Sequence, residues 1–159
     1  MKAGNPKTIL TLCVIHDHPR VLLGMKKRGF GSGKWNGFGG HVEAGEAIAD
    51  AARREVLEES GVTVSELVPM GVLEFTFEGK PGMLEVHVFK SSAYEGEPYE
   101  SEEMRPQWFT VDEIPFDIMW PDDRYWMPLL LSGKKFKGKF HFGAENVIKN
   151  QHLEELLSA

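Results

Sequence analysis

The segment from Gly40 to Val62 limits what this chain can fold into more than any other part of it. It predicts a helix that opens near Ala47 and ends at Gly61, the residue type that most readily adopts the left-handed conformation after a helix. The helical period places five residues on one buried stripe: Ile48, Ala51, Ala52, Glu55 and Glu59. Two glutamates therefore stand where apolar side chains are expected.

Glu58 lies beside these two glutamates, so we expect three carboxylates to point into a cleft of the protein. Like charges three or four residues apart repel each other on a helix, and partial burial adds to the cost. A bound divalent cation removes this repulsion. Mg²⁺ suits best, because it takes hard oxygen ligands and shares one or two carboxylates with substrate phosphates. The alternative, a solvated acidic helix, leaves the interrupted apolar stripe unexplained.

The composition is that of a soluble globular protein. The 159 residues are enough for one domain, 1–159, with a sizeable core, and 42% of them are hydrophobic. The single cysteine, Cys13, excludes an internal disulfide and fits a reducing compartment. It lies in the apolar run from Thr8 to Ile15, which predicts a core position. That run is too short to span a membrane and lacks a cleavage-site pattern, so we expect no membrane partner.

The formal net charge of −6 argues against polymeric nucleic acid as a partner, because that binding needs Lys and Arg side chains to neutralise many phosphates. A mononucleotide stays compatible with this charge. A triphosphate brings its own Mg²⁺, and an acidic cleft then favours its binding.

Hydrophobic periodicity predicts an α+β fold, a mixed β-sheet with flanking α-helices. The expected strands are Thr8 to Ile15, Val21 to Lys27, Leu73 to Phe77, Met83 to Phe89, Gln107 to Val111 and Phe136 to Phe142. A second helix is expected to begin at Asp122 or Asp123. The tail from Glu145 to Ala159 fits either a helix or a final strand.

Two glycine-rich segments precede the predicted helix. The first, Arg28 to Lys34, is neither a Walker loop nor a dinucleotide fingerprint, and it fits a mobile lid and a flexible hairpin connection equally well. Lys26 stands just before it and could pair with a phosphate, although an isolated lysine is more often solvated. The second segment, Trp35 to Gly40, carries Asn36. Its amide suits the edge of a base, and turn chemistry explains it equally well.

The aromatic segment from Met119 to Trp126 offers flat side chains on which a base could stack. A structural alternative places Asp122 or Asp123 at a helix N-cap and both tryptophans in the core. An N-cap explains one aspartate and leaves the other unexplained. Two adjacent buried carboxyl groups tend to share one proton, so that one donates a hydrogen bond and the other accepts one. Such a pair could distinguish purine edges.

Read as a whole, the pattern from Gly40 to Val62 is G, five residues, E, seven residues, R-E-V-L-E-E-S-G-V, and it resembles the Nudix box. This family hydrolyses nucleoside diphosphates linked to another group. The resemblance implies that Glu55, Glu58 and Glu59 bind Mg²⁺ together with a glycine carbonyl. It also implies that Glu59 is the base that activates water and that Arg54 orients a glutamate. Helix spacing lets Arg54 reach Glu58 at i+4.

Four further segments resemble one branch of the Nudix family, the animal oxidised purine nucleoside triphosphatases: Arg20 to Gly31, Lys34 to Gly40, Glu103 to Phe109 and Met119 to Asp123. The likeness covers roughly Ile9 to Phe142. It implies a Nudix fold, an α/β/α sandwich, and Mg²⁺-dependent hydrolysis of substrates such as 8-oxo-dGTP and 2-hydroxy-dATP to the monophosphate and pyrophosphate. It further implies that the protein cleans the nucleotide pool in the cytoplasm, and also in mitochondria and the nucleus. A monomer is the default expectation for a domain of this size.

The resemblance also assigns residues to the substrate. Asn36, Asp122 and Asp123 fall to the base edge, and Trp120 with the neighbouring Pro121 to the stacking segment. The substrate border consists of Thr11, Lys26 and the backbone of Phe38, Gly39, Gly40 and His41. The expected apolar pocket consists of Phe30, Phe75, Phe77, Met104 and Trp126. Gly39 or Gly40 and Glu103 would complete the metal shell.

Three features depart from that branch. His41 stands where lysine is usual, Leu84 replaces a pocket methionine, and the chain after Glu145 follows the pattern poorly. Two other functions stay open. One is a Nudix hydrolase of diadenosine polyphosphate, ADP-ribose or methylated caps, and the other is a non-catalytic nucleotide-binding module. Such a module would be expected to lose a box glutamate, and this chain keeps them all.

Overall fold

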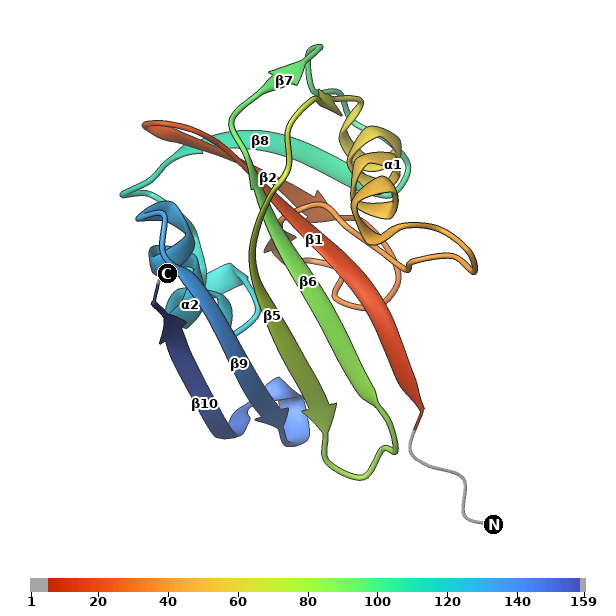
Figure 1. The fold of residues 1–159 in the computed structure, drawn as a ribbon, viewed down its shortest axis with the longest axis vertical. Helices are drawn as coiled ribbons and strands as arrows, with labels where there is room; N and C mark the ends of the chain where they lie inside the picture. Colours follow the sequence, from red (N-terminus) through yellow and green to blue (C-terminus); the bar gives the residue numbers. More distant parts are fainter. Residues whose placement is uncertain (1–5, 158–159) are drawn as a thin grey trace.

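A mixed eight-stranded sheet forms the centre of the protein in a computed structural model that describes residues 6–157 (Figure 1). The strand order is β10-β9-β5-β6-β1-β2-β3, and β8 also pairs with β2. Its strands are β1 (Lys7–Asp17), β2 (Arg20–Lys26), β3 (Trp35–Asn36), β5 (Val68–Phe77), β6 (Met83–Ser91), β8 (Met104–Thr110), β9 (Lys135–Phe142) and β10 (Ile148–Leu156). The pairs β1–β6 and β5–β9 are parallel, and the other pairs are antiparallel.

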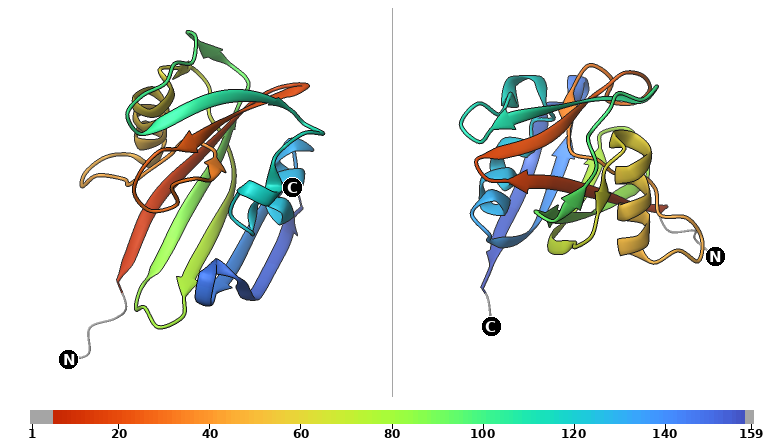
Figure 2. Two further views of the ribbon diagram at one scale, coloured as in Figure 1. Left: turned by 180° about the vertical axis from the view of Figure 1, so that it is seen from behind. Right: turned by 90° about the horizontal axis from the view of Figure 1, so that it is seen from above.

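The two α-helices cover opposite faces of this sheet (Figures 1 and 2). They are α1 (Ile48–Ser60) and α2 (Asp123–Leu131), and 3₁₀ turns occupy Phe116–Ile118 and Ala144–Asn146. A separate two-stranded sheet joins β4 (Thr63–Val64) to β7 (Tyr94–Glu95). This arrangement confirms the α+β class and the two-faced layering. Within residues 6–157, no helix has the length and apolarity needed to cross a bilayer.

The central strand β1 supplies apolar side chains to two separate cores, because successive residues of a strand face opposite sides. Val14 belongs to the core beneath α2, where Trp126 and Phe136 also lie. Cys13 and Ile15 belong to the core beneath α1. Cys13 is fully buried, as expected, and burial raises the pKa of its thiol to about 12. This thiol is therefore an inert packing group.

Helix α1 confirms the prediction made from the box. It begins after Ala47 and ends before Gly61, whose φ of 79° is left-handed and whose N–H binds the Leu57 carbonyl. A side chain at Gly61 would also collide with the ring of Tyr99, at 2.0 Å. The glycine is therefore required both by its backbone conformation and by the loop that packs on it.

Several strand boundaries differ from the predictions. β5 begins at Val68. An irregularity between Pro69 and Gly71 interrupts its pairing, so only the second half of the strand shows the alternation that the prediction used. β8 begins at Met104 and includes Pro106, which is compatible with a strand that pairs only with β2. The tail forms a strand, β10, and Ser158 and Ala159 lie outside the described residues. β3, β4 and β7 have two residues each, too few to show a period.

Candidate active site

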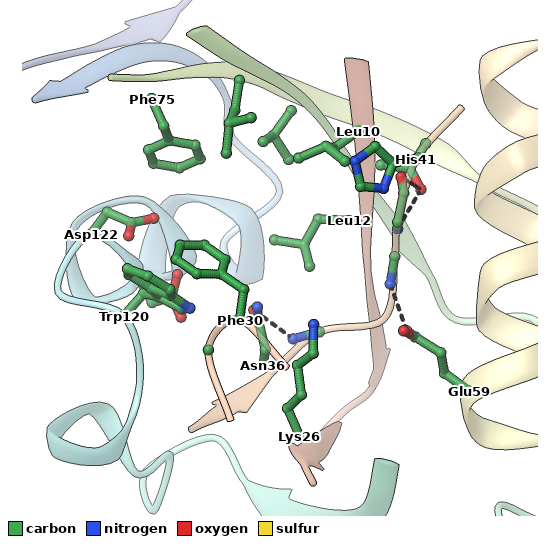
Figure 3. A pocket seen from close by; sticks show the side chains of 18 of the residues that line it. Leu10, Leu12, Lys26, Phe30, Asn36, His41, Glu59, Phe75, Trp120 and Asp122 are labelled. Carbon is green, nitrogen blue, oxygen red and sulfur yellow. Dashed lines mark hydrogen bonds between the residues drawn. The ribbon is translucent and has the colours of Figure 1, made fainter. Parts of the chain in front are cut away.

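A cavity of about 290 Å³ opens where β1 and β2 diverge (Figure 3). The two strands pair only at the end of β1, near Ile15 and Leu22. Towards the start of β1, the segment that follows β3 bridges to it instead of β2. The cavity is lined by Leu10, Thr11, Leu12, Lys26, Phe30, Gly31, Asn36, Gly37, Gly39, Gly40, His41, Glu59, Phe75, Phe77, Leu84, Val86, Met104, Trp120, Asp122, Asp123 and Phe142. This volume is close to the lower end of the usual range for small-molecule sites.

Residues Gly39 and Gly40 form the wall of the cavity nearest to α1. The Thr11 amide donates to the Gly40 carbonyl at 2.8 Å, which holds this segment against β1. A Cβ at Gly39 would lie 1.8 Å from the Thr11 carbonyl oxygen, and a Cβ at Gly40 would lie 2.6 Å from the Glu55 carboxyl carbon. Only glycine lets the backbone approach both the strand and a carboxylate this closely.

Glu59 is the box glutamate that reaches the cavity. The Gly39 N–H donates to Glu59 Oε1 at 2.9 Å. Burial, as the largest cause, and the Glu55 and Glu103 charges raise the pKa of Glu59 to about 8, although the Gly39 hydrogen bond and Lys26 oppose the shift. Without a bound cation this carboxyl group is therefore largely protonated at neutral pH, so it needs a nearby cation before it can act as a base there.

The expectation that all three box carboxylates point into a cleft is wrong for Glu58. The Glu55 side chain is 15% exposed, whereas that of Glu58 is 58% exposed. The apolar stripe explains the difference, since Val56 fills the buried position next to Ala52 and turns Glu58 outward. The role of Glu58 as a metal ligand stays a prediction.

Arg54 binds two other glutamates more closely than Glu58, its expected partner. Its guanidinium donates to both Glu46 carboxylate oxygens at 2.9 Å and to Glu55 Oε1 at 2.8 Å, whereas its distance to Glu58 is 3.6 Å. The hydrogen bonds from Arg54 lower the pKa of Glu46 to about 2. Glu46 lies in the loop before α1, so helix spacing could not reveal it. The box pattern itself, which includes Glu46, was the available signal.

The carboxylates fit a divalent cation in their chemistry. Glu55 and Glu59 both lie against the Gly39–Gly40 segment, and their mutual repulsion contributes to the raised pKa of Glu59. Mg²⁺ commonly uses one or two carboxylates and completes its shell with water and phosphate oxygens. Within residues 6–157, no group of three or more His, Cys, Asp or Glu side chains is assembled to hold a metal ion. Glu55 and Glu59 are thus the two box glutamates that lie against this segment.

Glu103 is engaged by Arg28, whose side chain donates to Glu103 Oε1 at 2.7 and 2.9 Å. These hydrogen bonds lower the pKa of Glu103. Met104, the next residue, lines the cavity, whereas Glu103 does not. The Glu103 charge still contributes to the raised pKa of Glu59. The sequence placed Glu103 in the metal shell by resemblance alone, and that role stays a prediction.

The opposite end of the cavity contains a buried pair of aspartates. Asp122 and Asp123 are 3% and 2% exposed. Asp122 occupies the N-cap position of α2 without making a capping hydrogen bond, and its Oδ2 instead accepts the Trp126 indole N–H at 2.8 Å. Asp123 Oδ2 is buried without a partner. Such an atom needs a ligand or a proton to offset its lost hydration.

Burial raises the pKa of both aspartates, and the neighbouring Asp122 charge raises that of Asp123 further. Asp123 therefore holds a proton more strongly than Asp122 does, and in its protonated form it presents a hydrogen-bond donor. Asp122 stays the acceptor because the Trp126 indole stabilises its charge. The geometry agrees with the shared-proton hypothesis. The N-cap alternative predicted the position of Asp122 correctly, but its side chain makes no capping hydrogen bond.

Aromatic side chains surround this end. The rings of Phe30 and Trp120 lie 5.1 Å apart, and Phe30 also contacts Phe77 edge-on at 6.1 Å. The Arg28–Lys34 segment is the hairpin connection between β2 and β3, and it carries Phe30 to the rim of the cavity. Asn36 lines the cavity while its Oδ1 accepts the N–H of the next residue, Gly37, at 2.9 Å, so one side chain both orders the local backbone and faces the cavity.

Three residues assigned to the substrate do not line the cavity. Phe38 and Trp126 are fully buried in the two cores, and Pro121 lies outside the lining. Of these, Trp126 still acts on the site, because it positions Asp122. The sequence did not identify the lining residues Leu10, Leu12, Gly31, Gly37, Val86 and Phe142 as such. In the sequence, Leu10, Leu12, Val86 and Phe142 cannot be distinguished from apolar strand residues that belong to the core.

The raised pKa of Glu59 predicts a pH-dependent stability difference in the absence of metal. Its native pKa of about 8 exceeds the ordinary 4.5, so its contribution to stability is complete below pH 4.5 and is lost as pH rises through 8. We expect Glu59→Gln to be more stable than the wild type at pH 9 by on the order of 3 kcal/mol, with little difference at pH 5. Denaturant unfolding in EDTA measures this, and an equal difference at both pH values would contradict it.

The fold and the site define an α+β protein with a cavity that carries a pair of aspartates at one end and Glu59 at the other. A NUDIX domain model matches residues 6–130. The oxidized purine nucleoside triphosphate hydrolase of Danio rerio is 55% identical over 93% of this chain and 95% of its own length. Its counterpart in Mus musculus is 53% identical over the same shares. The chain belongs to the Nudix family.

Solved structures agree with this assignment. The crystal structure of a MutT protein from Bacillus halodurans matches with a TM-score of 0.83 and 31% identity, over 92% of this chain and 97% of that one. The match extends over nearly the whole of both chains, which confirms the Nudix fold predicted from the sequence.

Proposed function

We propose that this protein is a Mg²⁺-dependent Nudix pyrophosphohydrolase that converts oxidised purine nucleoside triphosphates to the monophosphate and pyrophosphate. The similarity to the two animal hydrolases supports this proposal over nearly the whole chain. The observation that carries it is the buried Asp122–Asp123 pair at one end of a cavity whose other end holds Glu59. The aspartate end suits a purine base, and the Glu59 end suits a polyphosphate.

The aspartate end accounts for selectivity. Oxidation at C8 of guanine converts N7 from an acceptor to an N–H donor, and the 2-hydroxy group alters the edge of adenine. A protonated Asp123 beside an ionised Asp122 offers one donor and one acceptor, and Asn36 adds its amide group. A base edge that matches this pattern satisfies Asp123 Oδ2, whereas a mismatched edge leaves a buried polar group unpaired.

The glutamate end accounts for hydrolysis. Glu55 and Glu59, with the Gly39 or Gly40 carbonyl, would hold Mg²⁺. The cation would supply charge neutralisation on phosphate oxygens and a lower pKa for a bound water. Glu59 accepts a proton from the attacking water, and its bond to the Gly39 N–H fixes the orientation of the carboxylate. Arg54 holds Glu55 in place. Lys26, which also lines the cavity, offers its ammonium group to the phosphates.

A substrate panel tests the proposal. With Mg²⁺, we expect kcat/KM for 8-oxo-dGTP and 2-hydroxy-dATP to exceed that for dGTP and dATP by about 10- to 100-fold, which is the effect of one hydrogen bond to a charged group. Release of pyrophosphate is the measurement, with ADP-ribose and diadenosine tetraphosphate as the competing Nudix substrates. Preference for either of these, or release of orthophosphate, would contradict the proposal.

A further inference from the structure

Arg28 lies opposite Glu102 and Glu103 because of the register between β2 and β8. The last pair of that ladder joins Lys26 to Met104, and the Lys27 N–H then donates to the Glu103 carbonyl at 2.8 Å. The segment before β8 is also held against α1, since the Ser101 hydroxyl donates to the Glu59 carbonyl at 3.3 Å. The backbone therefore places the Arg28–Glu103 pair near the end of the helix that carries Glu59.

The Arg28 guanidinium binds one oxygen of Glu103. Its Nε and Nη2 both donate to Glu103 Oε1, at 2.9 and 2.7 Å, and Nη2 also donates to Glu102 Oε2 at 3.3 Å. Glu103 Oε2 takes part in none of the hydrogen bonds of the described residues. The carboxylate is thus oriented through one oxygen, and the other stays free to bind a ligand.

Arg54 shows the same arrangement with Glu46 and Glu55. It donates to Glu55 Oε1 at 2.8 Å while Glu46 holds its guanidinium at 2.9 Å. In both cases the arginine donates hydrogen bonds to two glutamates. One glutamate fixes the guanidinium, and the other is oriented by it through a single carboxylate oxygen. Partners that fix the orientation of a ligating carboxylate commonly set metal affinity as strongly as the ligand's own position does.

We propose that Arg28 is a second positioning arginine, which orients Glu103 for a divalent cation as Arg54 orients Glu55. This inference rests on the metal dependence of the proposed function, and it adds a residue outside the Nudix box to the machinery. A pure charge effect would act in the opposite direction, because removing a positive charge near the site strengthens the binding of a cation. The sign of the change therefore separates positioning from electrostatics.

Binding of Mn²⁺ tests the proposal without turnover. Electron paramagnetic resonance of free Mn²⁺ gives its affinity for the protein, alone and with α,β-imido-dGTP, a triphosphate that resists cleavage. We expect Arg28→Gln to weaken Mn²⁺ binding by about three- to tenfold. This is below the 10- to 100-fold typical of outer-shell partners, because the Arg28 and Glu103 side chains are 61% and 48% exposed. Arg28→Lys should recover part of the affinity.

Lys27→Gln is the matched control. Lys27 is the neighbouring cation and binds Glu100 and the Ser101 carbonyl, so its loss removes the same charge and leaves Glu103 oriented. We expect this variant to bind Mn²⁺ as tightly as the wild type or slightly more tightly. In a Glu103→Gln background, Arg28→Gln should cause no further weakening.

Three results would overturn the proposal: unchanged or tighter Mn²⁺ binding in Arg28→Gln, equal weakening in Lys27→Gln, or full weakening by Arg28→Gln when Glu103 is already glutamine. Each leaves the proposed hydrolysis untouched, since that depends on the substrate panel. Equal thermal unfolding temperatures of Arg28→Gln and the wild type show that the surface pair does not act through folding.

Discussion

Glu59→Gln is expected to lower kcat for 8-oxo-dGTP by about 10³-fold, within the range for loss of a general base. The structure singles out Glu59 because it lines the cavity, whereas Glu55 is held by Arg54 and Glu58 is mainly exposed. Glutamine keeps an oxygen that can accept the Gly39 N–H, so the geometry of the segment is preserved. Pyrophosphate release at saturating Mg²⁺ is the measurement.

Two controls make this prediction specific. Glu66→Gln removes an exposed carboxylate after α1 and should leave kcat unchanged. Glu59→Gln should still bind the product 8-oxo-dGMP, because the aspartate pair lies at the other end of the cavity. If Glu59→Gln keeps the wild-type kcat, Glu59 is not the general base. Loss of product binding would instead indicate a disturbed cavity.

The second large effect is expected from the aspartates. Their pKa values are both raised, so the pair keeps a proton to a higher pH than two ordinary aspartates would, and loses it as pH rises through the higher of the two. Loss of that proton removes the donor at Asp123 and leaves two buried negative charges. Binding of 8-oxo-dGMP by the wild type should therefore weaken by about 10- to 100-fold on the alkaline side.

Asp123→Asn should flatten this alkaline decrease, because the amide donor does not titrate. Its preference between 8-oxo-dGTP and 2-hydroxy-dATP should also stop changing between about pH 6 and 9. Calorimetric titration with 8-oxo-dGMP measures the first effect, and any ionisation of the ligand itself is common to both proteins. Asp117→Asn, on an exposed side chain paired with Arg124, is the control. An alkaline limb that is identical in the wild type and Asp123→Asn would show that another group titrates.

The box allowed α1 to be predicted closely because it carries a local signal. Its apolar period, the glutamates that interrupt the period and the terminal glycine all lie within one segment, and helices form from contacts between near neighbours. The same locality explains what was missed. Helix spacing predicted that Arg54 reaches Glu58, and the two form an ion pair at 3.6 Å. The closer partner, Glu46, approaches Arg54 from the preceding loop. Spacing along a helix contains no information about a loop that folds back onto it.

The aspartate segment shows a similar division. Its letters predicted a helix start and a proton-sharing pair, because adjacent carboxyl groups in apolar surroundings have few other uses. Trp126 was expected to line the pocket, yet it is buried behind Asp122 and donates its indole N–H to that carboxylate. Which face of a short helix meets a ligand depends on how that helix docks on the sheet, and the sequence of the helix does not specify this.

The family, the layered fold and the residue types at both ends of the site could be predicted from the sequence, because these depend on short patterns of charge, glycine and hydrophobic period. Which groups meet could not be predicted in this way, since it depends on how distant segments pack. The divergence of β1 from β2 creates the cavity, and the β2–β8 register brings Arg28 to Glu103. Both are contacts between residues far apart in the chain, and such contacts follow from the packing of the whole sheet.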